Sequence, residues 1–338
     1  MKIALINVPI AAPWLGEDAW ITVPPQGYGG IQWVVATLID GLLELGHEVF
    51  LLGAPGSVST VESLRVVNAG RPEDIGRWLT ENDVDVVHDS SNGSVSLDEP
   101  SSRRGFLSTH HLTGRPKNPV NAVYLSHAQR RQAKATIDSP VIRIPVNPTR
   151  FNFRSEKSDY LLFLGRISPW KGALEAAAFA KAAGVPAILA GPAWEKDYLD
   201  EILNRFGDTV RFVGEVSGDE RLSLLSEARA VLVMSQPLPG PWGDEWSEPG
   251  ATVISEAAAS GTPVISTSNG CLDEITPKVG RIVHSSDMIN ETSAKRILES
   301  LPSPETVRAV AIQEWGYLKI AKQYEILYKD VIAGRRWC

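Results

Sequence analysis

The sequence predicts an α/β protein built from two parallel sheets, each wrapped by helices. Short β-branched runs alternate with helix-length amphipathic segments, which is the pattern of repeated strand–helix–strand units. A polar, proline-containing stretch at residues 145–158 interrupts this pattern, which then starts again. The length of 338 residues also suggests two domains, each able to bury a core of its own.

The first half begins with an expected strand at Lys2–Val8. Apolar residues then recur at helical spacing from Ile31 to Leu45, and Gly46-His47 ends this helix before an expected strand at Glu48–Leu52. The other strands expected in this half are Val84–His88, Gly105–Ser108, Ala122–Leu125 and Val141–Ile144.

In the second half, short apolar runs and amphipathic segments alternate again. The expected strands are Tyr160–Leu164, Ala187–Ala190, Val210–Val213, Ala230–Met234 and Pro263–Ser266. The expected helices are Gly172–Ala183, Lys196–Phe206, Asp219–Ala228 and Ala251–Ala259, with a final helical stretch from Thr306 to about Ala333. Its expected apolar anchors are Trp315, Leu318, Ile320, Tyr324, Ile326 and Leu327. A ligand is expected at the carboxyl ends of the strands, in a cleft between the two sheets.

The composition argues against several classes of protein. A formal charge of −7 and a pI near 5.5 argue against nucleic acid as a partner, because phosphate binding requires a basic surface. The two cysteines, Cys271 and Cys338, predict no disulfide framework and favour the cytoplasm. The N-terminus lacks a signal-peptide cleavage site, and no apolar run approaches the roughly 18 residues of a transmembrane helix. At most peripheral membrane contact is expected.

A glycine-rich segment, PPQGYGGIQWVV at Pro24–Val35, precedes the first helix. Its backbone amides and the helix dipole could receive an anion. Gly27-Tyr28-Gly29 begins like a dinucleotide fingerprint, but Gln32 stands at its sixth position, which disfavours a Rossmann cofactor site. A helix entry that binds no ligand remains an equal alternative.

Two cations follow the expected strand Tyr160–Leu164 in the stretch LFLGRISPWKG. Arg166 comes directly after the strand, and Lys171 lies at the start of the next helix. Such a pair suits a diphosphate. Lysine at a helix N-terminus opposes the helix dipole, so a diphosphate clamp is favoured over a solvated pair.

Two glutamates, Glu248 and Glu256, stand eight residues apart in the stretch SEPGATVISEAAASG. On one helix their Cα atoms would be about 12 Å apart, which is too far for the carboxylate pair of a retaining double displacement. The spacing suits two ends of a nucleoside diphosphate sugar, with the amides of Gly250, Ala251 and Thr252 on the phosphates between them. Either glutamate alone is more often a surface residue, but their apolar context favours a site.

His110 and His111 end an expected strand, where neighbouring side chains point to opposite faces, so a joint metal site is not expected. One of them could face the cleft. Asp83 and Asp85 form an Asp-x-Asp pattern, but its alternation is typical of a strand entry with a solvated turn. No metal-ligand cluster is predicted.

Together these motifs resemble the retaining GT-B glycosyltransferases of family 4. The resemblance covers almost the whole chain. It includes Gly29-Gly30, Gly165-Arg166 with Lys171-Gly172, and the Glu248/Glu256 pair, together with GHEV, FVGEV, SGTPVIS, NGCLDEI and the C-terminal EWGYLKIAKQYEILY. The details PPQGYGGIQWVVA, LAGPAW and SEPGAT are most similar to glycosyltransferases of orthosomycin (avilamycin-type) antibiotic assembly.

The resemblance implies two Rossmann-like domains, at 1–150 with about 316–338 (acceptor side) and at 151–315 (donor side), with the last helix crossing back to the first domain. It implies transfer of a sugar, with retention, from a nucleotide donor such as a UDP-sugar to a hydroxyl acceptor, without a metal or another cofactor. The resemblance implies that Arg166 and Lys171 bind the diphosphate, that Glu256 binds the ribose and that Glu248 binds the donor sugar. It implies that the backbone around Gly214 and Val216 recognises the base, and that Gly29 and Gly30 let the first domain approach the phosphate. His110, or less so His111, is implied to lie beside the transferred sugar.

The chain departs from the family pattern in two places. After Glu248 the family usually has Gly-Phe/Leu-Gly, whereas this chain has Pro249-Gly250-Ala251, and Pro249 has no amide to donate. The approach to Glu248, residues 236–247, is longer than usual, and its Trp242 and Trp246 could form a lip over the donor sugar or acceptor. A nucleotide-sugar epimerase and a catalytically silent nucleotide-sugar-binding protein remain the alternatives.

Overall fold

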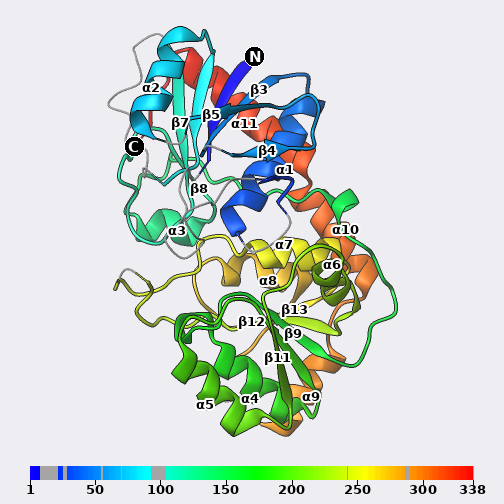
Figure 1. The fold of residues 1–338 in the computed structure, drawn as a ribbon. Helices are drawn as coiled ribbons and strands as arrows, with labels where there is room; N and C mark the ends of the chain where they lie inside the picture. Colours follow the sequence, from blue (N-terminus) through cyan, green and yellow to red (C-terminus); the bar gives the residue numbers. More distant parts are fainter. Residues whose placement is uncertain are drawn as a thin grey trace. The chain divides into compact units, whose positions relative to one another are not determined.

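A computed structural model describes residues 1–7, 22–25, 29–54, 56–69, 71–92, 104–241, 243–285 and 290–337. The chain forms two compact units, shown in Figure 1. Unit 1 comprises Met1–Pro145 and Tyr317–Cys338, and unit 2 comprises Val146–Gly316. The resemblance places these boundaries at 150/151 and about 315/316. In the described part of the chain, no helix has both the length and the apolar character needed to cross a membrane.

Unit 1 is a parallel sheet with the strand order β5-β3-β1-β6-β7-β8. Its strands are β1 (Lys2–Ile6), β3 (Glu48–Gly53), β5 (Arg65–Asn68), β6 (Val86–Asp89), β7 (Gly105–His110) and β8 (Ala122–Tyr124). Its helices are α1 (Gly30–Glu44), α2 (Pro72–Glu81), α3 (His127–Gln132) and α11 (Tyr317–Ile332). A short parallel pair, β2 (Thr22–Val23) and β4 (Val58–Ser59), stands apart from the main sheet.

Unit 2 repeats this design with the order β11-β10-β9-β12-β13-β14, again all parallel. Its strands are β9 (Leu161–Leu164), β10 (Ala187–Ala190), β11 (Val210–Gly214), β12 (Ala230–Val233), β13 (Val264–Ser266) and β14 (Gly280–Ile282). Its helices are α4 (Ala173–Ala183), α5 (Lys196–Phe206), α6 (Gly218–Glu227), α7 (Thr252–Ala259), α8 (Leu272–Val279), α9 (Glu291–Glu299) and α10 (Pro304–Trp315), with short 3₁₀ turns at Pro148–Arg150 and Pro169–Lys171.

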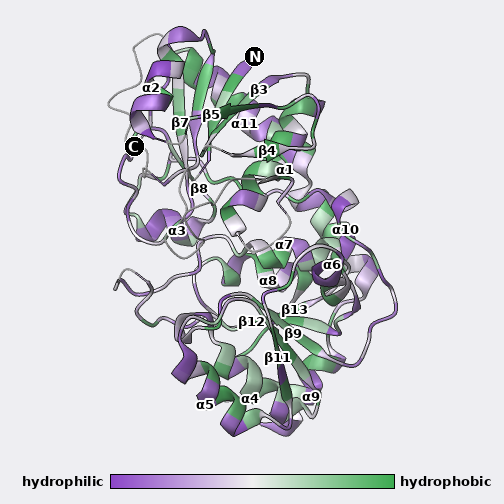
Figure 2. Ribbon diagram, in the orientation of Figure 1, coloured by the Kyte–Doolittle hydropathy of each residue, from purple (hydrophilic) through white to green (hydrophobic). Residues whose placement is uncertain are grey.

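Helices cover both sheets, so the central strands are buried and apolar on both faces. Figure 2 shows this as mainly hydrophobic strands in both units, whereas α2 and α3 carry hydrophilic residues. Parallel strands place their carboxyl ends at one edge of the sheet, where ligands of such folds bind. The segments that follow β9, β11 and β12 in unit 2, and β6 and β7 in unit 1, are therefore the places to look for a site.

One expected strand, Val141–Ile144, is wrong. Only a single bridge forms there, between Val141 and Tyr124. Pro140 and Pro145 flank the segment, and proline lacks the amide that a ladder requires, so the pairing cannot extend.

The C-terminal helical stretch also differs from the expectation, because it is two helices that meet at Gly316. Within α11 the buried residues are Ile320, Ala321, Tyr324, Tyr328 and Val331, which form one face at helical spacing. The expected anchor Ile326 lies outside this face and is 60% exposed.

A buried polar network attaches α11 to the sheet of unit 1. The two ring nitrogens of His88 lie 2.8 Å from the Tyr328 hydroxyl and 2.7 Å from Thr109 Oγ1. Thr109 Oγ1 in turn lies 2.8 Å from the Tyr324 hydroxyl. The chain returns from unit 2 and adds its last helix to unit 1 through these contacts, with aliphatic packing of α11 around them.

Three buried histidines make unit 1 sensitive to acid. Burial lowers the pKa of His88 and His111 to about 3 and that of His110 to about 4, whereas histidine in an unfolded chain titrates near 6.5. Above pH 6.5 these three histidines are neutral in both the folded and the unfolded chain and do not oppose folding. As the pH falls from 6.5 toward 4, the unfolded chain binds protons that the folded chain does not, at a cost of about 1.4 kcal/mol per pH unit and histidine.

We therefore expect amide-exchange protection in unit 1 to fall between pH 7 and pH 5. Unit 2 is the internal control, because its single histidine, His284, is exposed. Equal loss of protection in both units, or none in unit 1, would contradict the assignment.

Candidate functional site

Arg166 and Lys171 lie where the sequence predicts, after the carboxyl end of β9. The chain turns through Pro169–Lys171 and enters α4 at Gly172, whose φ of 75° is left-handed. A Cβ on Gly172 would stand 1.8 Å from the carbonyl oxygen of Met234, so only glycine fits there. This close approach sets Lys171 against the end of β12.

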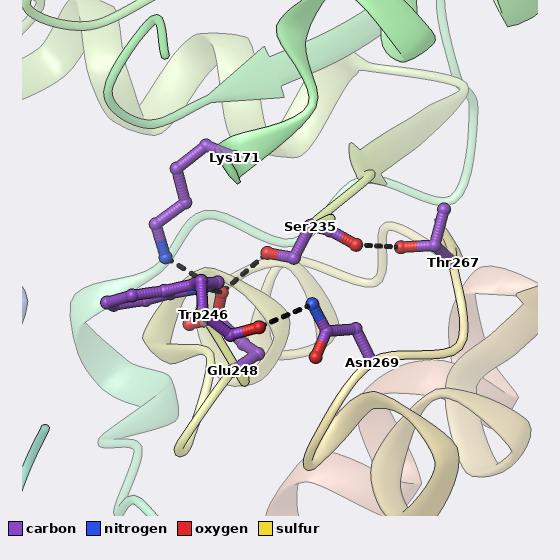
Figure 3. Close-up of polar contacts among 6 residues, drawn as sticks. All are labelled: Lys171, Ser235, Trp246, Glu248, Thr267 and Asn269. Atoms are coloured by element: carbon purple, nitrogen blue, oxygen red, sulfur yellow. Dashed lines mark hydrogen bonds and ion pairs between the residues drawn. The ribbon is translucent and has the colours of Figure 1, made fainter. Parts of the chain in front are cut away.

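Lys171 is paired with Glu248 (Figure 3). Lys171 Nζ donates to Glu248 Oε2 at 2.7 Å. The same oxygen accepts from Ser235 Oγ at 2.6 Å and from Trp246 Nε1 at 3.1 Å. All three donors use Oε2, and no described residue donates to Oε1.

This environment holds Glu248 in its charged form. Burial opposes ionisation, but the charge of Lys171 and the hydrogen bonds from Lys171, Ser235 and Trp246 outweigh it, so the pKa of Glu248 lies below its ordinary value. The Glu248 backbone is fixed as well, since Cys271 N donates to its carbonyl oxygen at 2.8 Å. A Cβ on Gly270 would stand 2.4 Å from the same oxygen.

Trp246 is buried, with 7% of its surface exposed, and does not form an open lip. Its ring lies under Lys171, with Nζ 4.3 Å from the centroid. Trp242 lies outside the described residues.

The segment that joins Glu248 to α7 presents free amides. Gly250, Ala251 and Thr252 have no hydrogen bond from their amides to any described residue, as expected for the open start of a helix. Ala251 has a left-handed φ of 52°, which is unfavourable for a residue with a Cβ by about 1–2 kcal/mol. The amides remain a suitable anion site although Pro249 contributes none.

Glu256, on α7, is paired with Arg221 at 2.5 Å, and both side chains are buried. Arg221 reaches only Oε2, and Oε1 has no partner among the described residues. Burial raises the pKa of Glu256, and Arg221 offsets this in part. Arg221 was not among the site residues predicted from the sequence. Its available signal was a cation in the first turn of the helix that follows FVGEV.

Arg166 is held by aromatic rings. Its guanidinium carbon lies 3.9 Å from the centroid of Trp194 and 5.7 Å from that of Trp170. Trp194 is 45% exposed.

Gly214 ends β11 with a φ of 78°, and its carbonyl accepts from Gly191 N at 2.7 Å. Val216 is buried just beyond it. Both lie at the carboxyl end of β11, which pairs with β10, at the same sheet edge as Arg166.

The predicted residues of unit 1 are Gly29, Gly30, His110 and His111. Gly29 precedes α1 with a φ of 142°, and Gly30 is its first residue; Gly27 and Tyr28 lie outside the described residues. His110 Nε2 donates to Gly114 O at 3.1 Å, so this nitrogen is occupied. His111 Nε2 is buried without a partner in the described part of the chain.

Asp83 and Asp85 are exposed and precede β6. Asp85 accepts from Lys2 N at 2.7 Å, at the amino end of the sheet. The pair lies at the edge opposite to His110. Among the residues that the structure describes, no group of three or more His, Cys, Asp or Glu side chains could hold a metal ion.

Comparison with known proteins decides the family. A family model described as "Glycosyl transferases group 1" matches residues 148–311. The crystal structure of AviGT4, a glycosyltransferase involved in avilamycin A biosynthesis, is 55% identical to this chain, with a TM-score of 0.94. The match covers 100% of this chain and 99% of that one. The chain belongs to the group 1 glycosyltransferases.

More distant structures confirm the GT-B fold of this glycosyltransferase. Sucrose-phosphate synthase from Thermosynechococcus elongatus is 18% identical, with a TM-score of 0.74, and the match covers 99% of this chain and 100% of that one. Anabaena Alr3699/HepE, in complex with UDP and glucose, is 16% identical, with a TM-score of 0.66 over 98% and 100% of the two chains. No curated protein sequence matches the chain.

Proposed function

We propose that this glycosyltransferase is a family 4 enzyme that moves a sugar from a nucleotide diphosphate donor, such as a UDP-sugar, to a hydroxyl acceptor with retention of configuration. The Lys171–Glu248 pair beside the open start of α7 carries the proposal. It combines a cation for a diphosphate, free amides for phosphate oxygens and a charged carboxylate for sugar hydroxyls. The similarity to AviGT4 supports a place in antibiotic assembly. The chain has two cysteines, Cys271 and Cys338, and such a low cysteine content favours the cytoplasm.

The donor would lie across unit 2. Arg166 and Lys171 would bind the diphosphate, together with the amides of Gly250, Ala251 and Thr252. Glu256 would accept the ribose hydroxyls on its free Oε1, and the backbone at Gly214 and Val216 would contact the base. HepE, which binds UDP-glucose, has the same fold and supports a uridine nucleotide.

Transfer would occur on one face of the sugar. The bond from C1 to the phosphate oxygen breaks as the bond from C1 to the acceptor oxygen forms, and the acceptor proton passes to the departing phosphate. Arg166 and Lys171 would stabilise the negative charge on that phosphate. Glu248 would hold the sugar as positive charge develops on it. Gly29 and Gly30 would allow close approach of unit 1, and His110 or His111 would contact the transferred sugar.

The two glutamates should separate binding from turnover. Glu256→Gln should weaken nucleotide binding by about 1–3 kcal/mol, the range for a hydrogen bond to a charged group. Glu248→Gln should leave nucleotide affinity almost unchanged, because Lys171 stays available to the diphosphate, but should lower kcat. Calorimetry with UDP, GDP, ADP and TDP, followed by steady-state kinetics, measures both.

Glu201→Gln is the matched control, since Glu201 is an exposed carboxylate of the same unit. Reversed roles of the two glutamates would overturn the donor orientation. If neither variant changes nucleotide binding or kcat, the active site does not include these two glutamates. Conversion of the donor without an acceptor would indicate an epimerase.

We also propose that transfer needs no metal, because Arg166 and Lys171 supply the positive charge that a cation would provide. Turnover should persist in excess EDTA. Loss of turnover in EDTA that is reversed by adding Mn²⁺ or Mg²⁺ alone would contradict this.

A further inference from the structure

The described part of the loop before Glu248, residues 236–241 and 243–247, is attached to the proposed donor site at both ends. Gln236 N donates to Trp170 O at 2.9 Å, one residue before Lys171. At the other end, Asn269 Nδ2 donates to Trp246 O at 3.2 Å (Figure 3). Since its ends are fixed in this way, the loop is a part of the site and not a separate surface feature.

Trp246 contacts both members of the Lys171–Glu248 pair. The negative face of an aromatic ring attracts a cation, and the Lys171 ammonium lies over that face. The indole N–H is only a donor, and it points to the Glu248 carboxylate. One rigid side chain thereby fixes the separation and the orientation of both charges.

We propose that Trp246 is a positioning residue for donor-sugar binding. Together with Lys171 and Ser235 it donates to Oε2, which holds the Glu248 carboxylate in place and leaves Oε1 for a hydroxyl of the donor sugar. The end of this loop that carries Trp246 is then a determinant of donor-sugar specificity. This inference rests on the proposed sugar-binding role of Glu248.

Trp246→Phe tests the proposal, because it keeps a ring under Lys171 and removes only the N–H. We expect nucleotide affinity to remain unchanged and kcat to fall roughly 10- to 100-fold, as for loss of a hydrogen bond to a buried charge. Loss of this donor should also raise the pKa of Glu248 and move the acidic limb of kcat to higher pH. Carbon-13 NMR of labelled glutamate measures that pKa without any turnover.

Trp337→Phe is the matched control, since Trp337 is also buried and donates its indole N–H, to Ala122 O at 2.9 Å, but in unit 1. It should leave the Glu248 pKa and kcat unchanged. An unaltered Glu248 pKa in Trp246→Phe would overturn the positioning role, even if activity fell. A raised pKa with unaltered kcat would overturn the sugar-binding role of Glu248 instead.

A second, independent observation concerns the charge around α3. Residues 104–143 contain seven Lys or Arg and one acid, Asp138, in a chain whose total charge is −7. Arg115, Arg131 and Lys134 are exposed. None of these three forms an ion pair within the described part of the chain. We call these three cations the α3 surface.

The α3 surface lies at the ligand-binding edge of unit 1. Arg115 is in the loop after β7, and α3 follows β8, so both come from the carboxyl ends of neighbouring strands. Gly114 joins them, because its amide donates to Gln132 Oε1 at 3.3 Å on α3 and its carbonyl accepts from His110. The cations are thus placed beside the histidine proposed to contact the reacting sugar.

We infer that the acceptor carries an anionic group, a phosphate or a carboxylate, which the α3 surface binds. A chain of net charge −7 repels such an acceptor, and a local positive region at the binding edge reverses this. The inference rests on the proposed transferase function and names the class of its acceptor.

Glucose 1-phosphate is the probe and glucose its neutral match, both titrated into the full chain by NMR. Replacing Arg115, Arg131 and Lys134 with serine should weaken binding of glucose 1-phosphate roughly tenfold and leave glucose unaffected. Serine at Lys196, Arg205 and Lys295, three exposed cations of unit 2, gives the same change in net charge and should have no effect.

Equal binding by both triple variants would overturn the inference. So would binding to vesicles of anionic lipid without binding to glucose 1-phosphate, which would identify a membrane surface. Donor hydrolysis should stay intact in the serine variant, and its absence from the unaltered chain would count against the transferase function itself.

Discussion

The structure of the proposed donor site depends on one ion pair, in which Lys171 neutralises the buried carboxylate of Glu248. Removing Lys171 would leave the buried carboxylate of Glu248 without its cation, which is unfavourable, so the position of each side chain depends on the other. The backbone on both sides is fixed by close approach, with Gly172 against Met234 and Gly270 against Glu248. No side chain fits at either glycine. The geometry of the pair is therefore set by the packing of the loops after β9, β12 and β13.

Glu248 and Glu256 show how environment separates two similar groups. Both are buried carboxylates paired with a cation. Glu248 has three donors and its pKa falls, whereas Glu256 has one and its pKa rises. Glu248 therefore stays ionised. Each carboxylate leaves Oε1 without a partner among the described residues, so the two differ in the number of donors to Oε2 and in the direction of the pKa shift. This difference supports the proposal that Glu248 stabilises charge and that Glu256 recognises a ligand hydroxyl.

The sequence predicts most of unit 2, because five of its strands are apolar runs bounded by turn residues and most of its helices have a clear period. The short strand β14 and the helices α8 and α9 were not expected. The sequence predicts unit 1 less well. The expected strand Val141–Ile144 fails because proline on both sides outweighs β-branched composition. Ile326 was expected to be buried on its apolar character alone, and this does not show which face of a helix packs against the sheet. The hydrogen bonds among His88, Thr109 and the two tyrosines place the face with Tyr324 and Tyr328 there.

For the site, sequence spacing locates Arg166, Lys171 and the two glutamates, but not their partners. Lys171 and Glu248 are 77 residues apart, and only the folded sheet brings them together. Arg221 and Ser235 are ordinary residues in sequence and become significant through contact. The expected helix at Ala251–Ala259, which leaves Glu248 before the helix and Glu256 within it, agrees with α7 at Thr252–Ala259.

The local rules of protein structure are broken most densely between Trp246 and Glu256. This stretch holds the buried carboxylate that pairs with Lys171, a non-glycine residue in the left-handed region at Ala251, and a helix start whose amides have no partner in the described part of the chain. Each feature is unfavourable alone, and such strain persists where the surrounding structure enforces it, most often at functional sites. In the family pattern glycine would relieve the backbone at Ala251. This chain instead has Ala251 in the unfavourable left-handed conformation, close in sequence to an unusually long loop whose Trp246 contacts both Lys171 and Glu248. The two departures from the family lie on either side of Glu248, and together they reshape the part of the site assigned to the donor sugar.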